Sequence, residues 1–119
     1  MSLDFNFEDY LEAEVLDQRG KVIGNLDCYW TDETTDEALF LGVRTKPSTE
    51  GVSVVPASLA EANERESCVV LLTGENKVSK APQLECDAEL DTPFERRVYN
   101  YFELSIPEEV HHLHIHRGS

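Results

Sequence analysis

The stretch Val15-Leu16-Asp17-Gln18-Arg19-Gly20-Lys21-Val22-Ile23-Gly24-Asn25-Leu26 decides the fold class. A polar turn separates two apolar runs, and Gly20 supplies a residue that takes a positive φ at little cost. Gly24 interrupts the second run, and a glycine inside a strand marks a bulge or a close backbone approach. We therefore expect a β-hairpin with strands at 12–16 and 22–30, of the kind that opens a small β-barrel.

Three further apolar runs are expected to form strands, because each has the length of a buried strand. A polar hairpin loop at 32–37 precedes the first run, and Pro56 ends the second. Ser58-x-x-Glu61 has the spacing of a capping box and predicts one or two helical turns. Residues 78–84 are expected to be extended, because the residue before Pro82 disfavours helix. The predicted strands are 38–44, 52–56 and 68–72.

A C-terminal helix is predicted over residues 93–103. Thr92 has the side chain of an N-cap, Pro93 suits the first helical position and Glu95 the third. The apolar side chains recur at i, i+4, i+7 and i+8, which predicts one face buried against the strands. These residues are Phe94, Val98, Tyr101 and Phe102. The expected fold class is mainly β, a small barrel of five to six antiparallel strands with a short amphipathic helix.

Four short motifs follow one another in the order of a known family. Gly20-Lys21-Val22-Ile23-Gly24 has the form G-x-x-[IV]-G, and Val54-Val55-Pro56 is a hydrophobic-proline step at the end of the fourth strand. Lys80-Ala81-Pro82 is a short proline segment after the fifth strand, and Tyr99-Asn100-Tyr101-Phe102 is an aromatic helix end. Over residues 11–104 the chain resembles the PRC-barrel family, named after the cytoplasmic part of the photosynthetic reaction centre H subunit.

Membership of that family implies a fold more than a function, because folds host sites rather than define them. The barrel of the H subunit caps a membrane complex, and that of the ribosome maturation factor contacts the small ribosomal subunit. We expect neither a transmembrane helix nor a preceding second barrel in this chain. The resemblance is therefore to the free-standing members, and it implies docking to a protein assembly.

Acidic residues dominate the charge, with 24 Asp and Glu against 10 Lys and Arg and a net charge of −14. Such a surface repels phosphate backbones, so we expect no direct binding of nucleic acid. It favours a protein partner with a basic surface, and a solvated acidic surface without a specific partner is the alternative. A calcium site at 32–37 is disfavoured, because the loop lacks the glycine and distal glutamate of an EF-hand. The acids form three clusters: Asp4, Glu8, Asp9, Glu12 and Glu14; Asp27, Asp32, Glu33, Asp36 and Glu37; and Glu85, Asp87, Glu89, Asp91 and Glu95.

No motif of a common enzyme class is present. The sequence lacks a phosphate-binding P-loop, a dinucleotide fingerprint, a G-x-S-x-G elbow and an H-E-x-x-H helix. We therefore predict no catalytic residue, no cofactor and no enzymatic activity. Three cysteines without a C-x-x-C pair indicate neither a disulfide framework nor a zinc site. Cys28 and Cys68 are expected in the core, as are Tyr29, Trp30 and Phe40, and Cys86 lies in an acidic segment.

The tail contains a run of alternating histidines. If it is extended, His112, His114 and His116 lie on one face, and Leu113 and Ile115 on the other. This alternation predicts an edge strand, laid on the barrel or on a second subunit; a disordered or tag-derived tail is an alternative. Imidazoles also suit zinc, nickel or copper, but same-face neighbours on a strand lie about 7 Å apart, which strains a shared coordination sphere.

The 119 residues are enough for one core. We expect an N-terminal extension at 1–10, the barrel with its helix at 11–104 and a histidine-containing tail at 105–119. Without a signal peptide or a membrane-spanning stretch, a cytoplasmic location is expected. The predicted function is a non-enzymatic interaction or scaffold module that docks to a protein assembly through acidic surfaces. A metal-binding accessory protein that uses His112, His114 and His116 is the alternative, and a homo-oligomer is left open.

Overall fold

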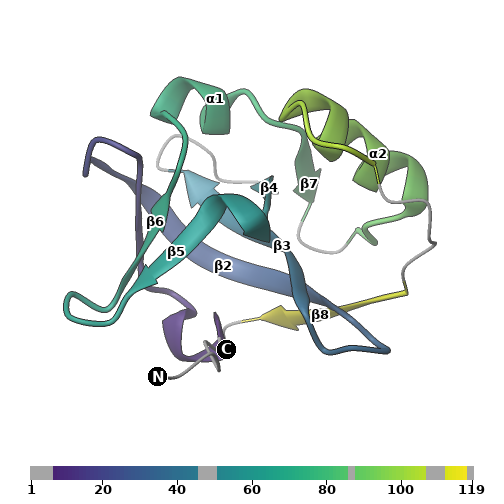
Figure 1. Cartoon of the computed structure of the whole chain (residues 1–119), viewed down its shortest axis with the longest axis horizontal. Helices are drawn as coiled ribbons and strands as arrows, with labels where there is room; N and C mark the ends of the chain where they lie inside the picture. The colour runs from purple at the N-terminus through teal and green to yellow at the C-terminus, as the bar shows by residue number, and fades with distance from the viewer. Residues whose placement is uncertain (1–6, 46–50, 86–87, 107–111, 118–119) are drawn as a thin grey trace.

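The computed structural model describes residues 7–45, 51–85, 88–106 and 112–117, and this part of the chain is mainly β (Figure 1). Its helical elements are η1 (Phe7–Tyr10), η2 (Ala57–Leu59), α1 (Glu75–Ser79) and α2 (Thr92–Tyr101). Eight strands join in one sheet. They are β1 (Glu14–Leu16), β2 (Val22–Asp32), β3 (Ala38–Thr45), β4 (Gly51–Pro56), β5 (Ala60–Asn63), β6 (Cys68–Leu71), β7 (Gln83–Glu85) and β8 (Leu113–Arg117).

The long strand β2 organises the sheet. One of its edges pairs with β3, with Leu26 opposite Val43. The other edge pairs first with β1 and then with β8, which places Gly24 opposite Val15 and Trp30 opposite Ile115. The strand order is β5-β6-β1-β2-β3-β4-β7, with β8 added to β2. The apolar run that forms β3 is central, because β2 and β4 cover both of its edges.

The closed barrel of five to six antiparallel strands is not confirmed. Among the described residues β5 and β7 end the sheet and do not pair with each other, so the sheet is open. The strands number eight, and β1 pairs with β6 in parallel, with Val15 opposite Val69. The other strand pairings are antiparallel. The extra strands are short, and runs of three or four residues are too short to carry a clear period in the sequence.

The first hairpin forms as predicted. Gly20 has a φ of +85° in its turn, where the carboxylate of Asp17 accepts hydrogen bonds from the backbone N–H groups of Lys21 and Arg19 at 2.9 Å each. These bonds favour the ionised form and hold the pKa of Asp17 below its usual value. Gly24 lies so close to the backbone of Arg44 that a Cβ would overlap the carbonyl oxygen. The ladder between β1 and β2 shifts register at this point, so both the bulge and the close approach are confirmed.

Two predictions about the middle of the chain were wrong. The capping box at Ser58 does not start a helix: a short 3₁₀ turn is followed at once by β5, where Ala60 pairs with Leu71 and Ala62 with Val69. Ladder hydrogen bonds to an apolar partner strand outweigh one or two helical turns, which are marginal in water. The extended segment predicted at 78–84 was wrong in its first part: Val78 and Ser79 end the helix α1, where Val78 is fully buried, and Pro82 restrains only the residue before it. Gln83 and Leu84 are extended as expected and belong to β7.

Helix α2 begins one residue earlier than predicted and ends two residues earlier. Its N-cap is Asp91 rather than Thr92, since the Asp91 carboxylate accepts a hydrogen bond from the Phe94 N–H at 3.0 Å. Thr92 takes the first helical position. Glu103, at a φ of +59°, turns the chain away after the helix.

The apolar stripe of α2 packs as expected. Phe94, Val98 and Phe102 are buried, while Tyr101 is half-buried. Tyr99, which lies outside the predicted stripe, is also buried, and its ring contacts Phe40 of β3 at 5.3 Å between centroids. The helix is therefore bound to the sheet by aromatic contacts.

The core contains the residues expected there and takes in both ends of the described chain. Tyr29, Trp30 and Phe40 are buried, as are Cys28 and Cys68. Cys86 lies outside the described residues. Phe7 of η1 is buried, and its ring lies tilted against that of Tyr29 with centroids 5.8 Å apart. The strand β8 extends the sheet from the tail. The segments at either side of residues 11–104 thus contribute to one common core.

Packing of α2 predicts a large loss of stability when its stripe is truncated. Phe102→Ala is expected to cost about 3 kcal/mol of unfolding free energy, because it removes a buried aromatic ring and leaves a cavity. Arg96 is exposed on the same helix, so Arg96→Ala is the control and is expected to change stability by less than about 0.5 kcal/mol. Denaturant unfolding of both variants measures this, and an unchanged midpoint for Phe102→Ala would contradict the packing.

The N-cap assignment has its own test. Asp91→Ala is expected to destabilise the protein by about 1 kcal/mol, because the Phe94 N–H loses its acceptor. Thr92→Ala is expected to be close to neutral, since Thr92 is exposed and already helical. Thermal melts of the two variants measure this difference. A larger loss of stability in Thr92→Ala than in Asp91→Ala would show that Thr92 is the N-cap.

Candidate functional site

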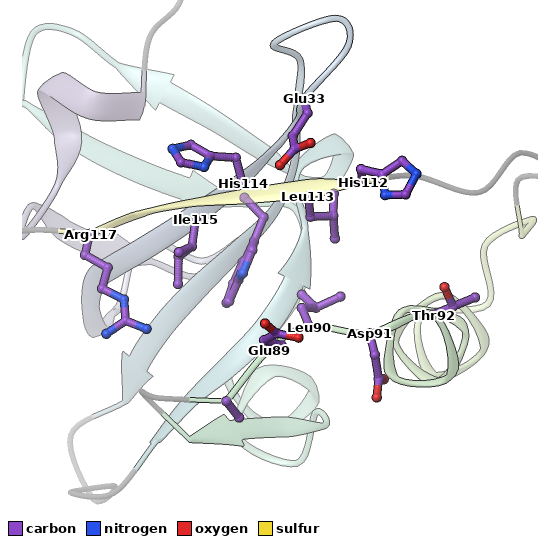
Figure 2. Close-up of a pocket in the computed structure, with 12 residues that line it drawn as sticks. Glu33, Glu89, Leu90, Asp91, Thr92, His112, Leu113, His114, Ile115 and Arg117 are labelled. Atoms are coloured by element: carbon purple, nitrogen blue, oxygen red, sulfur yellow. The ribbon is translucent and has the colours of Figure 1, made fainter.

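The candidate site is a hollow of about 440 Å³ between β8 and the segment that leads into α2 (Figure 2). We call it the β8 hollow. Leu113 and Ile115 extend from the side of β8 on which Glu89 and Leu90 of the opposite wall lie, as Figure 2 shows. Trp30 of β2 also lines the hollow and is 3% exposed, while Leu90 is 9% exposed. The base of the hollow is therefore apolar and closed to most solvent.

Charged side chains border the same hollow. Glu33 comes from the β2–β3 loop, and Glu89 and Asp91 come from the segment before α2. The carboxylates of all three residues are exposed, as are His112 and Arg117 on the β8 side. The Glu33 N–H donates a 2.8 Å hydrogen bond to the carbonyl of His112, which ties the loop to β8. Three carboxylates against one guanidinium leave the border acidic.

The tail forms the predicted edge strand, laid on its own sheet. The two faces of β8 differ as expected: Figure 2 shows His114 on the opposite side of the strand from Leu113 and Ile115. His116 stacks on Tyr29 with centroids 4.6 Å apart and planes 9° apart, and its Nε2 lies 2.9 Å from the Thr31 hydroxyl. One of the predicted metal-binding histidines thus already serves to attach β8 to β2.

The three histidines do not come together as a metal site. The rings of His114 and His116 lie 4.8 Å apart, edge to face, and His112 precedes the strand. Within residues 7–45, 51–85, 88–106 and 112–117, no group of three His, Cys, Asp or Glu side chains could hold a metal ion. Metal binding by the tail therefore rests on the histidine spacing alone.

Carboxylates from different acidic clusters of the sequence lie near two buried tyrosines, Tyr29 and Tyr99. Burial raises the pKa of Tyr29, and the carboxylates of Glu8, Asp9 and Asp36 raise it further. A phenolate would be repelled by these charges, so the shift reports carboxylates from two clusters around one ring.

Carboxylates from two clusters also lie near Tyr99. Burial raises the pKa of Tyr99 as well, and Glu95 and Glu37 raise it further. These two acids belong to the third and second clusters. Single members of the three clusters thus lie near one or other of these two buried tyrosines.

Some members of the clusters have structural tasks. Arg44 donates a 2.9 Å hydrogen bond to Asp27 and forms an ion pair with it. Asp32 accepts a hydrogen bond from the Thr34 N–H at 2.7 Å, which shapes the expected hairpin loop. Glu95 is buried. Asp4 and Asp87 lie outside the described residues.

The motif residues beyond the first hairpin occupy structural positions. Pro56 ends β4 opposite Phe40, and the carbonyl of Pro82 accepts a hydrogen bond from Val54. Tyr101 donates a 2.6 Å hydrogen bond to the carbonyl of Lys77 and so joins α2 to α1. None of these residues lines the β8 hollow.

Sequence reasoning identified single parts of the hollow and missed the assembly. The sequence places Glu33 and Glu89 in acidic clusters, and Leu113 and Ile115 on the apolar face of a predicted strand. Leu90 carried no signal, because it stands alone among polar residues. Its role depends on contacts with a strand that follows more than twenty positions later.

The role of His116 predicts that the tail serves stability more than metal binding. His116→Ala is expected to cost about 1 kcal/mol, because the stack on Tyr29 and the contact with Thr31 are lost. His112→Ala is the exposed control. Titration of the metal-free protein with zinc, followed by calorimetry, is expected to show weak binding at most. A single tight site that disappears in the triple variant H112A/H114A/H116A would contradict this.

Among the described residues no helix is long and apolar enough to cross a membrane. In comparisons with known proteins, the sequence matches no protein-family model and no curated protein. The PRC-barrel resemblance therefore stays a prediction from its motifs.

Proposed function

We propose that this chain is a non-enzymatic interaction module of the PRC-barrel type, which docks to a protein assembly through its acidic surfaces. The docking position is the β8 hollow, and its occupant is a basic segment of the partner. The observation that carries this proposal is the combination of an apolar base with the exposed carboxylates of Glu33, Glu89 and Asp91 in one hollow.

Lysine and arginine side chains suit such a hollow. Each has a long apolar stem and a charged end, and the two parts prefer different surroundings. The stem packs against Leu113 and Ile115 while the charged end reaches Glu33 or Glu89. Because these carboxylates are exposed, each ion pair contributes only about 0–1 kcal/mol. Affinity therefore needs several pairs together with apolar contact.

The wider acidic surface supports the same assignment. Two of the three acidic clusters contribute carboxylates to the hollow, Glu33 from the second and Glu89 and Asp91 from the third, and the chain carries a net charge of −14. A field of this sign accelerates encounters with a basic partner and opposes nucleic acid. Its main effect is on the rate of association and on the choice of partner.

The PRC-type assignment is supported by the positions of the motif residues. Gly24 lies at the close approach to Arg44, Pro56 ends a central strand and Tyr101 attaches the last helix. These are the places where a strongly bent sheet with a terminal helix needs such residues. The metal-binding alternative has less support, because His116 is engaged with Tyr29 and Thr31.

Charge-neutral variants test the docking position. The probe is a short peptide that alternates lysine with leucine, and the readout is the emission of Trp30, the single tryptophan of the chain, which lines the hollow. We expect Glu33→Gln with Glu89→Gln to weaken binding by about fivefold or more. Association is also expected to slow as salt is added, because exposed charges are screened over about 10 Å at 0.1 M.

The control pair is Glu61→Gln with Glu64→Gln on the β5–β6 hairpin. It removes the same net charge from exposed positions that border a different hollow. Equal weakening by both pairs would show that only the overall charge matters and would overturn the docking position. Association that is independent of salt, or tight binding of a DNA or RNA oligonucleotide at physiological salt, would contradict the acidic docking surface.

A further inference from the structure

A second hollow of about 540 Å³ lies between the α1–β7 connection and α2. We call it the cationic groove. One wall contains Lys80, Pro82 and Gln83, and the other contains Arg97, Asn100 and Tyr101 of α2. Figure 1 shows α1, β7 and the C-terminal half of α2 close together, with β8 at the opposite side of the view. The groove is therefore separate from the β8 hollow.

The charge of this groove is the reverse of the rest of the molecule. None of its lining residues is Asp or Glu, although acids outnumber bases by 24 to 10 in the chain. The β8 hollow and two other surface hollows each have at least one carboxylate in their lining. Neither Lys80 nor Arg97 forms an ion pair within the described residues. Within the part of the chain that the structure describes, these two cations therefore have no carboxylate partner.

The walls of the groove are held in place. Tyr101 of α2 donates its hydrogen bond to the Lys77 carbonyl at 2.6 Å, three residues before Lys80. The Val54 N–H donates to the Pro82 carbonyl at 3.0 Å and anchors the other wall to β4. Arg97 lies over the Phe94 ring, 5.4 Å from its centroid. These contacts fix the two walls relative to each other, and a preformed groove binds with less loss of conformational entropy than one that must assemble.

Helix stabilisation explains only part of this arrangement. Lys80 is the C-cap of α1, and a cation is favourable at that end of a helix. Arg97 lies in the middle of α2, where no helix end accounts for it. Its guanidinium has a fork of donors that fits carboxylate or phosphate oxygens, and the side-chain amides of Gln83 and Asn100 add further donors.

We propose that the cationic groove binds the carboxylate or phosphate group of a small anionic molecule. The oxyanion accepts hydrogen bonds from Arg97 and Lys80, and the Tyr101 and Pro82 side chains offer an apolar surface for the rest of the molecule. The ligand carries few charges, because the repulsion from a net charge of −14 grows with each negative charge that approaches. This inference does not depend on docking at the β8 hollow.

Titration with small anions tests the proposal. Sodium acetate and sodium phosphate are added separately to the full chain at constant ionic strength, and the backbone amide signals of Gln83 and Tyr101 are followed by NMR. We expect saturable shifts with a dissociation constant on the order of 1 mM for at least one anion. Tighter binding of phosphate assigns a phosphate group to the ligand, and tighter binding of acetate assigns a carboxylate.

Three variants with the same loss of charge locate the site. Arg97→Gln is expected to weaken anion binding by about tenfold and Lys80→Gln by about threefold. Arg96→Gln, which is exposed on the same helix but does not line the groove, is expected to change binding by less than about twofold. Thermal melts confirm that each variant is folded before its affinity is compared.

Several outcomes would overturn the proposal. Shifts that do not saturate, or equal weakening by Arg96→Gln and Arg97→Gln, would show a general charge effect. Binding of a glutamate-rich peptide with no binding of either small anion would assign the groove to a protein segment. A change of oligomeric state in Arg97→Gln, measured by sedimentation, would assign it to a second copy of the chain.

Discussion

The fold depends on the hydrogen bonding of one strand along both of its edges. β2 is eleven residues long, and β3 covers one edge while β1 and β8 share the other. β1 pairs with residues 22–25 of β2 and β8 pairs with residues 28–32, so the two strands follow one another along the same edge. β1 then connects β2 to β6, and β3 connects it to β4, so every other strand is attached through these pairings. Among its central residues, Tyr29 contacts Phe7 of η1 and His116 of β8, and Trp30 lines the β8 hollow.

Charge is distributed unevenly over this framework. Carboxylates gather around η1, the β2–β3 loop and the start of α2, where they act on Tyr29 and Tyr99. The two cations of the cationic groove, Lys80 and Arg97, lie at the end of α1 and in the middle of α2. The helix thus connects an acidic hollow with a cationic groove. An unequal distribution of this kind lets one small domain attract partners of opposite charge at separate places, even though its net charge is strongly negative.

The strand β8 has two roles in this arrangement. Its histidine face attaches it to β2 through Tyr29 and Thr31, and its apolar face forms a wall of the hollow. Asp91 likewise caps α2 and borders the hollow. The proposed docking position is therefore built from parts that also stabilise the fold, and its shape depends on the tail being paired with the sheet.

Local chemistry allowed the sequence to predict the first hairpin, the buried strands, the apolar stripe of α2 and the edge strand of the tail. These predictions rest on properties of residues close together in the sequence: a turn glycine with a positive φ, a period of two or four residues, and a run of apolar side chains. Such properties favour the same local structure wherever the rest of the chain lies. The cap by Asp91, the strand at Ala60–Asn63, the helix at Glu75–Ser79 and the parallel pairing of β1 with β6 were decided by tertiary structure. Asp91 and Thr92 can both cap a helix, and β5 needs β6 as its partner. The two hollows were decided in the same way, because each combines side chains from segments far apart in the sequence, and only packing of the core sets the distance between them.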